Sequence, residues 1–265
     1  MSSELRVLGL DIGSRQIKGV VLGGGALEFV VVDSGSDPYS RSMEIVRGFA
    51  ADRIFATGYG RHFAKGDFAD GVVTEIKAHA VGARHLFPRC RTVIDIGGQD
   101  SKVILLDDSG SVADFQMNDR CAAGTGKFLE VMASTLGFEI SRFGREALLA
   151  ERGVKINSMC TVFAESEVVS LLAKKEKPRN VALGLHEAIA EKIYSMVKRV
   201  GLEGDVVFSG GVAYNPCVRE LLERRLERPL LVPDRPELVG ALGAALIAEA
   251  SGSRRAIDSS WGDRA

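Results

Sequence analysis

Two short segments of the chain carry an acidic residue, a glycine turn and a lysine in the same order. Residues 10–22 begin Leu-Asp-Ile-Gly-Ser-Arg-Gln-Ile-Lys, residues 94–106 begin Ile-Asp-Ile-Gly-Gly-Gln-Asp-Ser-Lys, and both continue into a mostly hydrophobic stretch. Two apolar strands around a glycine turn predict a β-hairpin in each copy. A glycine lets backbone N–H groups approach a phosphate, and a carboxylate can hold Mg²⁺ directly or through its waters. The repeat therefore predicts two phosphate-binding turns, one in each half of the chain.

The side chains at the two turns have separate candidate roles. We expect the two aspartates to hold Mg²⁺ through coordinated waters, and Ser14 and Lys18 to contact phosphate oxygens. Gln99 and Asp100 are the catalytic candidates, because a glutamine in such a turn can orient an attacking water without being a strong base. The candidate nucleotide-binding positions are Asp11, Gly13, Ser14, Lys18, Asp95, Gly97, Gly98, Gly210 and Gly211, and the Mg²⁺ candidates are Asp11 and Asp95.

The alternative interpretation is that each motif is an ordinary hairpin turn, in which any glycine serves and Lys18 is a solvated side chain. Taken singly, each motif favours that interpretation. It does not explain why Asp11 and Asp95 both precede the turn while Lys18 and Lys102 both follow it.

Cys121 and Cys160 form a second pair of candidate functional residues, since each precedes a helix-like stretch. A helix N-terminus lowers the pKa of a thiol and favours metal ligation. A lone cysteine at a helix start is more often a small buried hydrophobe, and the spacing of these two matches no compact zinc signature. Two ligands per chain become four across a two-fold axis, which is the number that a [4Fe–4S] cluster requires. Cys90 and Cys217 match no ligand motif, and we expect them to be structural.

Short apolar runs alternate with helical patterns to build these sites. Strands are expected at 5–10, 17–22, 27–32, 53–56, 92–96, 102–106, 112–116, 205–208 and 230–232, and helices at 41–51, 73–87, 125–136, 142–151, 161–175, 181–200, 216–227 and 236–250. The pattern predicts a duplicated α/β fold with a nucleotide cleft between its lobes. We expect a lobe at 1–88, a lobe at 89–250 whose final helix can pack across, and a loose tail at 251–265.

Composition narrows the function classes. The 265 residues include 34 basic and 35 acidic side chains, a balance that favours neither nucleic-acid nor membrane-surface binding. The start of the chain does not read as a leader, and no apolar run reaches transmembrane length. We expect a cytoplasmic protein without a nucleic-acid or membrane partner. Its four widely spaced cysteines do not suggest a disulfide framework.

The duplicated motifs resemble a known superfamily. Asp11-Ile-Gly-Ser with Lys18, and Asp95-Ile-Gly-Gly-Gln-Asp100, are similar to the two phosphate motifs of the actin, sugar-kinase and heat-shock-chaperone ATPases, and Ser209-Gly-Gly-Val-Ala213 is similar to their adenosine motif. This resemblance implies duplicated actin-like (ribonuclease H-like) lobes, with ATP or ADP between them and adenine close to Gly210 and Gly211.

A narrower resemblance involves the cysteines. Asn-Asp-Arg-Cys121-Ala-Ala-Gly-Thr-Gly, Cys160-Thr-Val-Phe-Ala-Glu-Ser-Glu and Thr57-Gly-Tyr-Gly-Arg61 resemble segments of the activators of 2-hydroxyacyl-CoA dehydratases and of the related ATPase subunits of benzoyl-CoA reductases. The resemblance implies a homodimer with one bridging [4Fe–4S] cluster, ligated at Cys121 and Cys160 and reduced by ferredoxin or flavodoxin. ATP hydrolysis then drives a low-potential electron into the partner dehydratase.

Three alternatives stay open on the sequence. An ATPase component of a benzoyl-CoA reductase would carry the same motifs. A small-molecule or sugar kinase would share the phosphate hairpins, although the chain has no specific acceptor motif. A catalytically silent ATP-binding regulator would share the fold, and ATPase activity lost on replacing Asp11 would argue against it.

Overall fold

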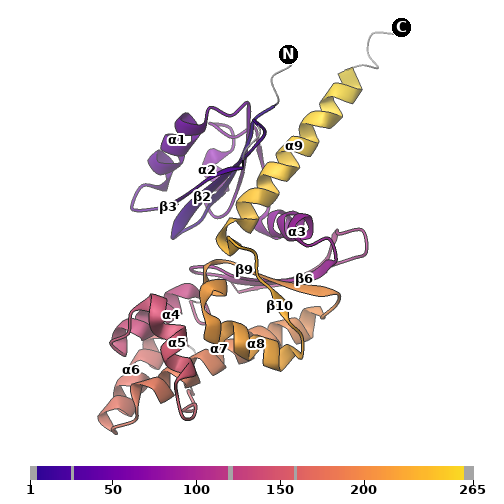
Figure 1. The fold of residues 1–265 in the computed structure, drawn as a ribbon. Coiled ribbons are helices and arrows are strands. Elements are labelled where there is room, and N and C mark those ends of the chain that lie inside the picture. The colour runs from indigo at the N-terminus through magenta and orange to yellow at the C-terminus, as the bar shows by residue number, and fades with distance from the viewer. Residues whose placement is uncertain (1–4, 25–26, 119–121, 158–159, 260–265) are drawn as a thin grey trace. The chain divides into compact units, whose positions relative to one another are not determined.

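The chain folds into two compact units, shown as a computed structural model in Figure 1. The structure describes residues 5–24, 27–118, 122–157 and 160–259. One unit comprises residues 1–88 and 237–265, and the other comprises residues 89–236. The final helix therefore belongs with the first unit, whereas the sequence pattern placed residues 237–250 with the second lobe while allowing that helix to pack across.

The first unit is built on a five-stranded sheet in the order β3-β2-β1-β4-β5. Antiparallel pairing joins β1 to β2 and β2 to β3, and parallel pairing joins β1 to β4 and β4 to β5. Every residue of β1 is buried, because this central strand is covered on both faces. The strands are β1 (Val7–Ile12), β2 (Gln16–Leu22), β3 (Glu28–Asp33), β4 (Arg53–Thr57) and β5 (Gly71–Val72).

One helix packs on this sheet at backbone distance, and a second helix packs equally closely on the first. α9 (Val239–Ser259) lies on β1. It also packs beside α3 (Glu75–Leu86), as Figure 1 shows. A Cβ added to Gly9 would lie 2.1 Å from the Ala241 carbonyl oxygen, and one added to Gly243 would lie 1.7 Å from that of Ala78. Small residues are therefore required along α9. This helix continues through Ser259 into the stretch expected as a loose tail, and residues 260–265 of that tail lie outside the described residues.

The remaining helices of the first unit are α1 (Pro38–Phe49) and the single turn α2 (Arg61–Ala64). α1 begins where Asp37 accepts a hydrogen bond from the Ser40 amide and a proline occupies the first helical turn. Ile45 of α1 joins the apolar cluster on one face of the sheet. Neither α2 nor the two-residue β5 was expected from the sequence, since both are too short to show a period.

The second unit repeats the sheet of the first. Its strand order is β10-β9-β6-β7-β8. Read from the other edge, β8-β7-β6-β9-β10 corresponds strand by strand to β3-β2-β1-β4-β5 of the first unit. The predicted duplication of the α/β fold is thus confirmed. The strands are β6 (Cys90–Ile96), β7 (Ser101–Leu106), β8 (Val112–Asn118), β9 (Asp205–Ser209) and β10 (Leu230–Leu231).

The two units differ between their third and fourth strands. In the first unit α1 fills this place, whereas in the second four helices lie between β8 and β9. They are α4 (Gly126–Thr135), α5 (Ile140–Leu148), α6 (Thr161–Ala173) and α7 (Pro178–Val200); α8 (Pro216–Leu226) follows β9, and short 3₁₀ turns occupy Gly211–Tyr214 and Pro236–Leu238. All of these α-helices contribute to one apolar core with β6, β7 and β9.

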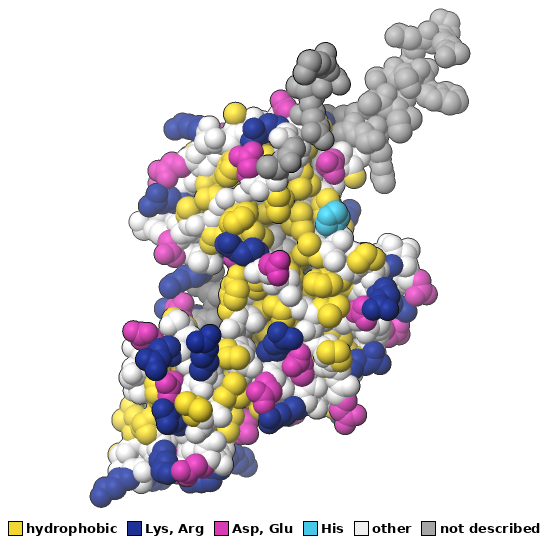
Figure 2. Space-filling view, in the orientation of Figure 1, with side chains coloured by type: hydrophobic (Ala, Val, Ile, Leu, Met, Phe, Trp, Pro, Cys, Tyr) yellow, Lys and Arg dark blue, Asp and Glu magenta, His cyan; other side chains and the backbone are white. Residues whose placement is uncertain are grey.

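The surface shows no area dominated by one charge over the face drawn in Figure 2, where basic and acidic side chains are interspersed. This distribution agrees with the near-zero net charge. Among the described residues, no helix combines the length and apolar character needed to cross a membrane.

Candidate nucleotide site and cysteine region

The two predicted turns have matching geometry. In the first hairpin Asp11 pairs with Lys18 across β1 and β2, and in the second Asp95 pairs with Lys102 across β6 and β7. In each hairpin the lysine Nζ lies 3.2 Å from the aspartate Oδ2. Both turns close through the amide of their first glycine: Gly13 donates to the Gln16 carbonyl (3.1 Å), and Gly97 donates to that of Asp100 (2.9 Å). The structure thus brings together the aspartate, glycine and lysine of each motif.

The carboxylate of the second turn is held more completely than that of the first. Asp95 is 2% exposed, and its Oδ1 accepts a hydrogen bond from the Ser209 hydroxyl at 3.0 Å. Lys102 bridges Asp95 and Asp100, whose Oδ1 lies 2.9 Å from Nζ. By contrast, within the described residues the Oδ1 of Asp11 has no hydrogen-bond partner. Lys102 is a site residue that was not selected from the sequence, although its alignment with Lys18 was the available signal.

The two predicted catalytic residues, Gln99 and Asp100, have different surroundings in the second turn. Asp100 contacts Lys102 and lies against Gly97, where an added Cβ would be 2.8 Å from Asp100 Oδ1. Its carboxylate therefore braces the turn. Gln99 is exposed at the tip, as is Ser14 of the first turn, so both side chains can reach a ligand.

A second duplicated feature flanks the carboxylates. β4 ends at Thr57 beside β1 and is followed by Gly58, and β9 ends at Ser209 beside β6 and is followed by Gly210. Gly58 and Gly210 have φ values of +85° and +84°. A Cβ on Gly58 would lie 2.6 Å from Asp11 Oδ1, and one on Gly210 would lie 2.9 Å from Asp95 Oδ1. Both positions therefore require glycine, because of the backbone conformation and the close approach of a carboxylate.

The Thr57–Arg61 loop is thus the first-unit counterpart of the predicted adenosine motif. Gly211 follows Gly210 at the start of a 3₁₀ turn and is exposed, so backbone there is open to a ligand. In the first unit the loop continues to Arg61, which lies 4.0 Å from Glu75 in the first turn of α3. Glu75 is a further carboxylate beside this loop, and no motif in the sequence marked it.

Of the two predicted cluster ligands, Cys160 is among the described residues and Cys121 is not. Cys160 is exposed at the N-cap of α6, whose Ala164 amide donates to the Cys160 carbonyl at 2.8 Å. On the same helix the apolar side chains of Phe163 and Val169 are 68% and 55% exposed. Cys121 lies outside the described residues. Among the residues that are described, no three His, Cys, Asp or Glu side chains group in a way that could hold a metal ion.

The other two cysteines are buried. The Sγ of Cys90 donates to the Thr92 carbonyl at 3.4 Å. Burial raises the pKa of the Cys217 thiol to about 12, with Glu220 adding to the shift. A thiol that stays protonated is a poor ligand, which supports the expected structural role.

A buried histidine fixes the middle of α7. His186 Nδ1 lies 2.7 Å from the Ala182 carbonyl, which can only accept, so Nδ1 carries the proton. Nε2 then accepts from the Asn215 amide nitrogen at 3.0 Å, while Asn215 Oδ1 caps α8. Complete burial lowers the pKa of His186 to about 4. The ring is neutral and joins α7 to α8.

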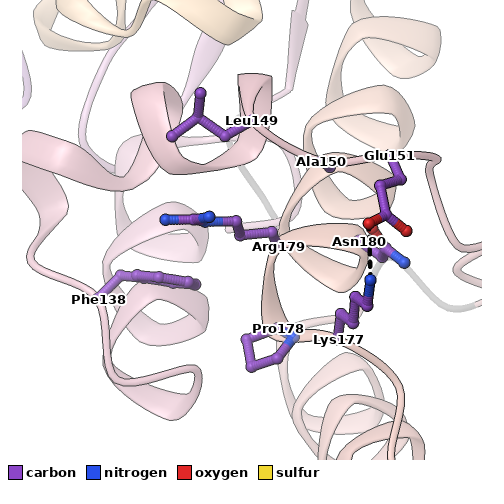
Figure 3. A pocket seen from close by; sticks show the side chains of 8 residues that line it. All are labelled: Phe138, Leu149, Ala150, Glu151, Lys177, Pro178, Arg179 and Asn180. Atoms are coloured by element: carbon purple, nitrogen blue, oxygen red, sulfur yellow. Dashed lines mark hydrogen bonds and ion pairs between the residues drawn. The ribbon is translucent and has the colours of Figure 1, made fainter.

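A cavity of about 300 Å³ opens where α5 ends and α7 begins. In Figure 3 the Arg179 side chain extends between Leu149 and Phe138, and Lys177 pairs with Glu151 at 2.7 Å. None of the predicted site residues lines it. Its lining residues are Phe138, Leu149, Ala150, Glu151, Lys177, Pro178, Arg179 and Asn180.

Comparison with known proteins places these features in a family. The BadF/BadG/BcrA/BcrD ATPase family matches residues 47–248. The chain belongs to this family. It is 42% identical over 251 residues to the 2-hydroxyisocaproyl-CoA dehydratase activator of Clostridioides difficile, a match that covers 91% of this chain and 94% of the relative. The predicted family resemblance and ATPase class are confirmed.

Two further comparisons bear on fold and partner. The structure of the Clostridium difficile activator of 2-hydroxyisocaproyl-CoA dehydratase with bound ADPNP has a TM-score of 0.84 and 41% identity, covering 95% of this chain and 97% of that one. A benzoyl-CoA reductase subunit of Thauera aromatica is 29% identical, covering 90% of this chain and 91% of the relative. The chain is thus similar to both classes that its motifs resemble, and more similar to the activator.

Proposed function

We propose that this protein is an ATP-dependent activator that delivers a low-potential electron to a 2-hydroxyacyl-CoA dehydratase. The observation that carries the proposal is the pair of matching Asp-Gly-Lys turns in a chain that is 42% identical, over nearly its full length, to a dehydratase activator. ATP hydrolysis at the turns supplies the free energy for an electron transfer that the reduction potentials alone disfavour.

In this proposal the turns bind Mg²⁺-ATP. Carboxylate oxygens are the ligands that Mg²⁺ takes, often through water, and Asp11 Oδ1 is available for that contact. Asp95 contributes through water from within its network with Lys102 and Ser209. Ser14, Lys18 and the Gly98 amide contact phosphate, while Gly13 and Gly97 let the turn backbone approach it. Gln99 orients the attacking water, and Gly210 and Gly211 leave room for adenine. Asp100 holds the second turn in shape through Lys102.

The cysteines supply the electron-carrying half of the proposal. Cys160 is exposed at the N-cap of α6, so its sulfur is open to a ligand. Cys121 and Cys160 provide two of the four thiolates that a [4Fe–4S] cluster needs, so a second copy of the chain completes the set. The exposed apolar side chains Phe163 and Val169 on α6 support contact with such a copy. When bound, the cluster supplies one-electron redox chemistry.

The remaining assignments follow from this activity. A one-electron donor such as ferredoxin or flavodoxin reduces the homodimer in the cytoplasm of an anaerobically growing cell. A benzoyl-CoA reductase is the second candidate partner, favoured by the 29% identity to one of the subunits of such an enzyme. Copurification of the native protein separates the two, since a dehydratase supports the first and a multi-subunit reductase the second.

The test is anaerobic purification followed by iron analysis and electron paramagnetic resonance with ATP and with ADP. We expect about four iron atoms per two chains, a signal that differs between the nucleotides, and loss of that signal in Cys121→Ser and in Cys160→Ser. Cys217→Ser is the control and keeps the signal. ATP turnover by a dimer that binds no iron would contradict the electron-transfer role while leaving the ATPase assignment intact.

A further inference from the structure

The first turn of α4 is bonded directly to the second phosphate turn. The amide of Gly126 donates to the Gly97 carbonyl at 2.9 Å, and the amide of Lys127 donates to the Gly98 carbonyl at 2.8 Å. The first amides of a helix have no partner within the helix. Here the turn supplies those partners, so its two carbonyls and the start of α4 form one hydrogen-bonded unit.

Peptide geometry links these carbonyls to the groups that face a phosphate. The Gly97 carbonyl shares a rigid plane with the Gly98 amide, and the Gly98 carbonyl shares one with the Gln99 amide. A phosphate that draws either amide toward itself rotates the whole plane, which the glycines permit. The carbonyl on the other side then moves relative to Gly126 and Lys127.

The segment before α4 has its own attachment. The carbonyl of Ala123 accepts from Lys192 Nζ at 2.6 Å and from the Asn118 side-chain amide at 3.2 Å. Lys192 comes from α7, and Asn118 is the last residue of β8. A Cβ on Gly124, at φ +81°, would lie 3.1 Å from Lys192 Cδ, so glycine lets the lysine stem lie against the segment.

We infer that Lys192 is a positioning residue that holds the segment after Cys121 against α7, next to the α4 residues bonded to the Gly97–Gly98 turn, and so makes this segment respond to the nucleotide phosphates. Rotation of the turn reaches α4 through two backbone bonds, and Lys192 holds Ala123, three residues before α4, to α7. Cys121 is two residues before the carbonyl that Lys192 holds. The inference rests on the proposed function, because it takes nucleotide at the turn as its input.

The test is amide hydrogen exchange of the full chain, with and without a non-hydrolysable ATP analogue and Mg²⁺. In the wild-type protein we expect the analogue to slow exchange both at 97–99 and at 122–130. In Lys192→Met, which keeps the stem and loses the ammonium, protection at 97–99 stays. Exchange at 122–130 with analogue becomes about tenfold faster, as expected when the charged hydrogen bond to Ala123 is lost. Lys192→Arg restores part of the response. Lys198→Met, at an exposed position on the same helix, behaves as wild type.

A second variant tests the backbone bonds without touching α7. Proline is tolerated at the first position of a helix, and the extended Thr125 suits a residue before proline. Gly126→Pro removes the amide that donates to Gly97, and we expect the nucleotide response of α4 to be lost. Ile140→Pro places proline at the equivalent position of α5 and keeps the response.

The outcomes separate this inference from the function on which it rests. If Lys192→Met and Gly126→Pro both respond at 122–130 as the wild type does, the positioning role is overturned. Protection at 97–99 alone in the wild type overturns it as well, while nucleotide binding stands. A wild-type protein that binds no analogue by calorimetry overturns the proposed function and this inference together.

Discussion

Replacing Lys102 with methionine tests how the duplicated turns divide their work. Methionine keeps the apolar stem and removes the ammonium, which leaves two carboxylates facing a 2% exposed position. Breaking a buried ion pair by removing one partner costs about 3–5 kcal/mol. In the first unit Lys18 has one carboxylate partner, and the two side chains are 16% and 11% exposed. We expect Lys18→Met to cost about 2 kcal/mol.

The difference is measurable by urea unfolding of the two variants, followed by hydrogen exchange in each unit. A gap of about 2 kcal/mol between the variants corresponds to roughly a 30-fold difference in the unfolding equilibrium. Adding Asp95→Asn to Lys102→Met removes one of the two carboxylates that faced the ammonium, and we expect part of the loss to be recovered. Lys198→Met controls for removal of an exposed lysine.

Equal losses in Lys18→Met and Lys102→Met would refute the reasoning, since burial and the second carboxylate partner would then carry no weight. A double variant less stable than Lys102→Met would refute it too, because the cost would then come from packing rather than from the buried carboxylate charge.

Three further predictions concern the same sites. Ser209→Ala removes a donor to a buried carboxylate and should lower the free energy of unfolding by about 1–3 kcal/mol, measured by thermal unfolding. Thr57→Val should be neutral or stabilising, because the Thr57 hydroxyl is buried without a hydrogen bond among the described residues. Equal losses of stability in the two variants would argue against this. Gly58→Ala should weaken ATP binding at least tenfold by calorimetry, while Gly35→Ala, with φ +61° and nothing within 4 Å, should leave affinity unchanged. The pKa of His186 is about 4 in the folded chain against an ordinary value of 6.5, so the folded chain binds fewer protons than the unfolded chain between these pH values. Stability should therefore fall by up to about 3 kcal/mol as pH drops from 6.5 to 4. His186→Gln should flatten that part of the pH profile of stability, and an unchanged profile would contradict the assignment.

Local sequence patterns predicted the hairpins and most of the helices, because strand alternation, turn glycines and helical periods act over a few residues. Hairpin register also places each aspartate opposite its lysine, a pairing that the motifs did not predict. The bridge from Lys102 to Asp100 could not be predicted in this way, since it depends on how the turn folds back toward the strand. In the sequence, Asp95, Asp100 and Lys102 are only near one another along the chain. The structure shows the lysine cation between the two carboxylates.

The equivalence of Thr57-Gly58 and Ser209-Gly210 was hidden by spacing. In the second unit 114 positions separate Asp95 from Ser209, because four helices lie between β8 and β9, while in the first unit the strands that carry Asp11 and Thr57 are joined through β2, β3 and one helix. No single offset aligns both the hairpins and the glycine turns. Strand pairing shows the match, since Asp11 lies opposite Thr57 and Asp95 lies opposite Ser209.

A comparison of the two turns also explains why the second is the one suited to coupling nucleotide phosphate to a helix. The first carbonyl of each turn needs a donor, and the two units satisfy it differently. In the first unit the Ser34 hydroxyl donates to the Gly13 carbonyl at 2.6 Å, directly after β3, so the turn is closed by its own unit's meander. In the second unit the Gly97 carbonyl accepts instead from Gly126, at the start of the helical segment that follows Cys121. A rotation of the first turn therefore ends at a local side chain, whereas a rotation of the second turn reaches a helix. The two units thus differ at the contact through which a phosphate-dependent rotation of the turn would be passed to a helix.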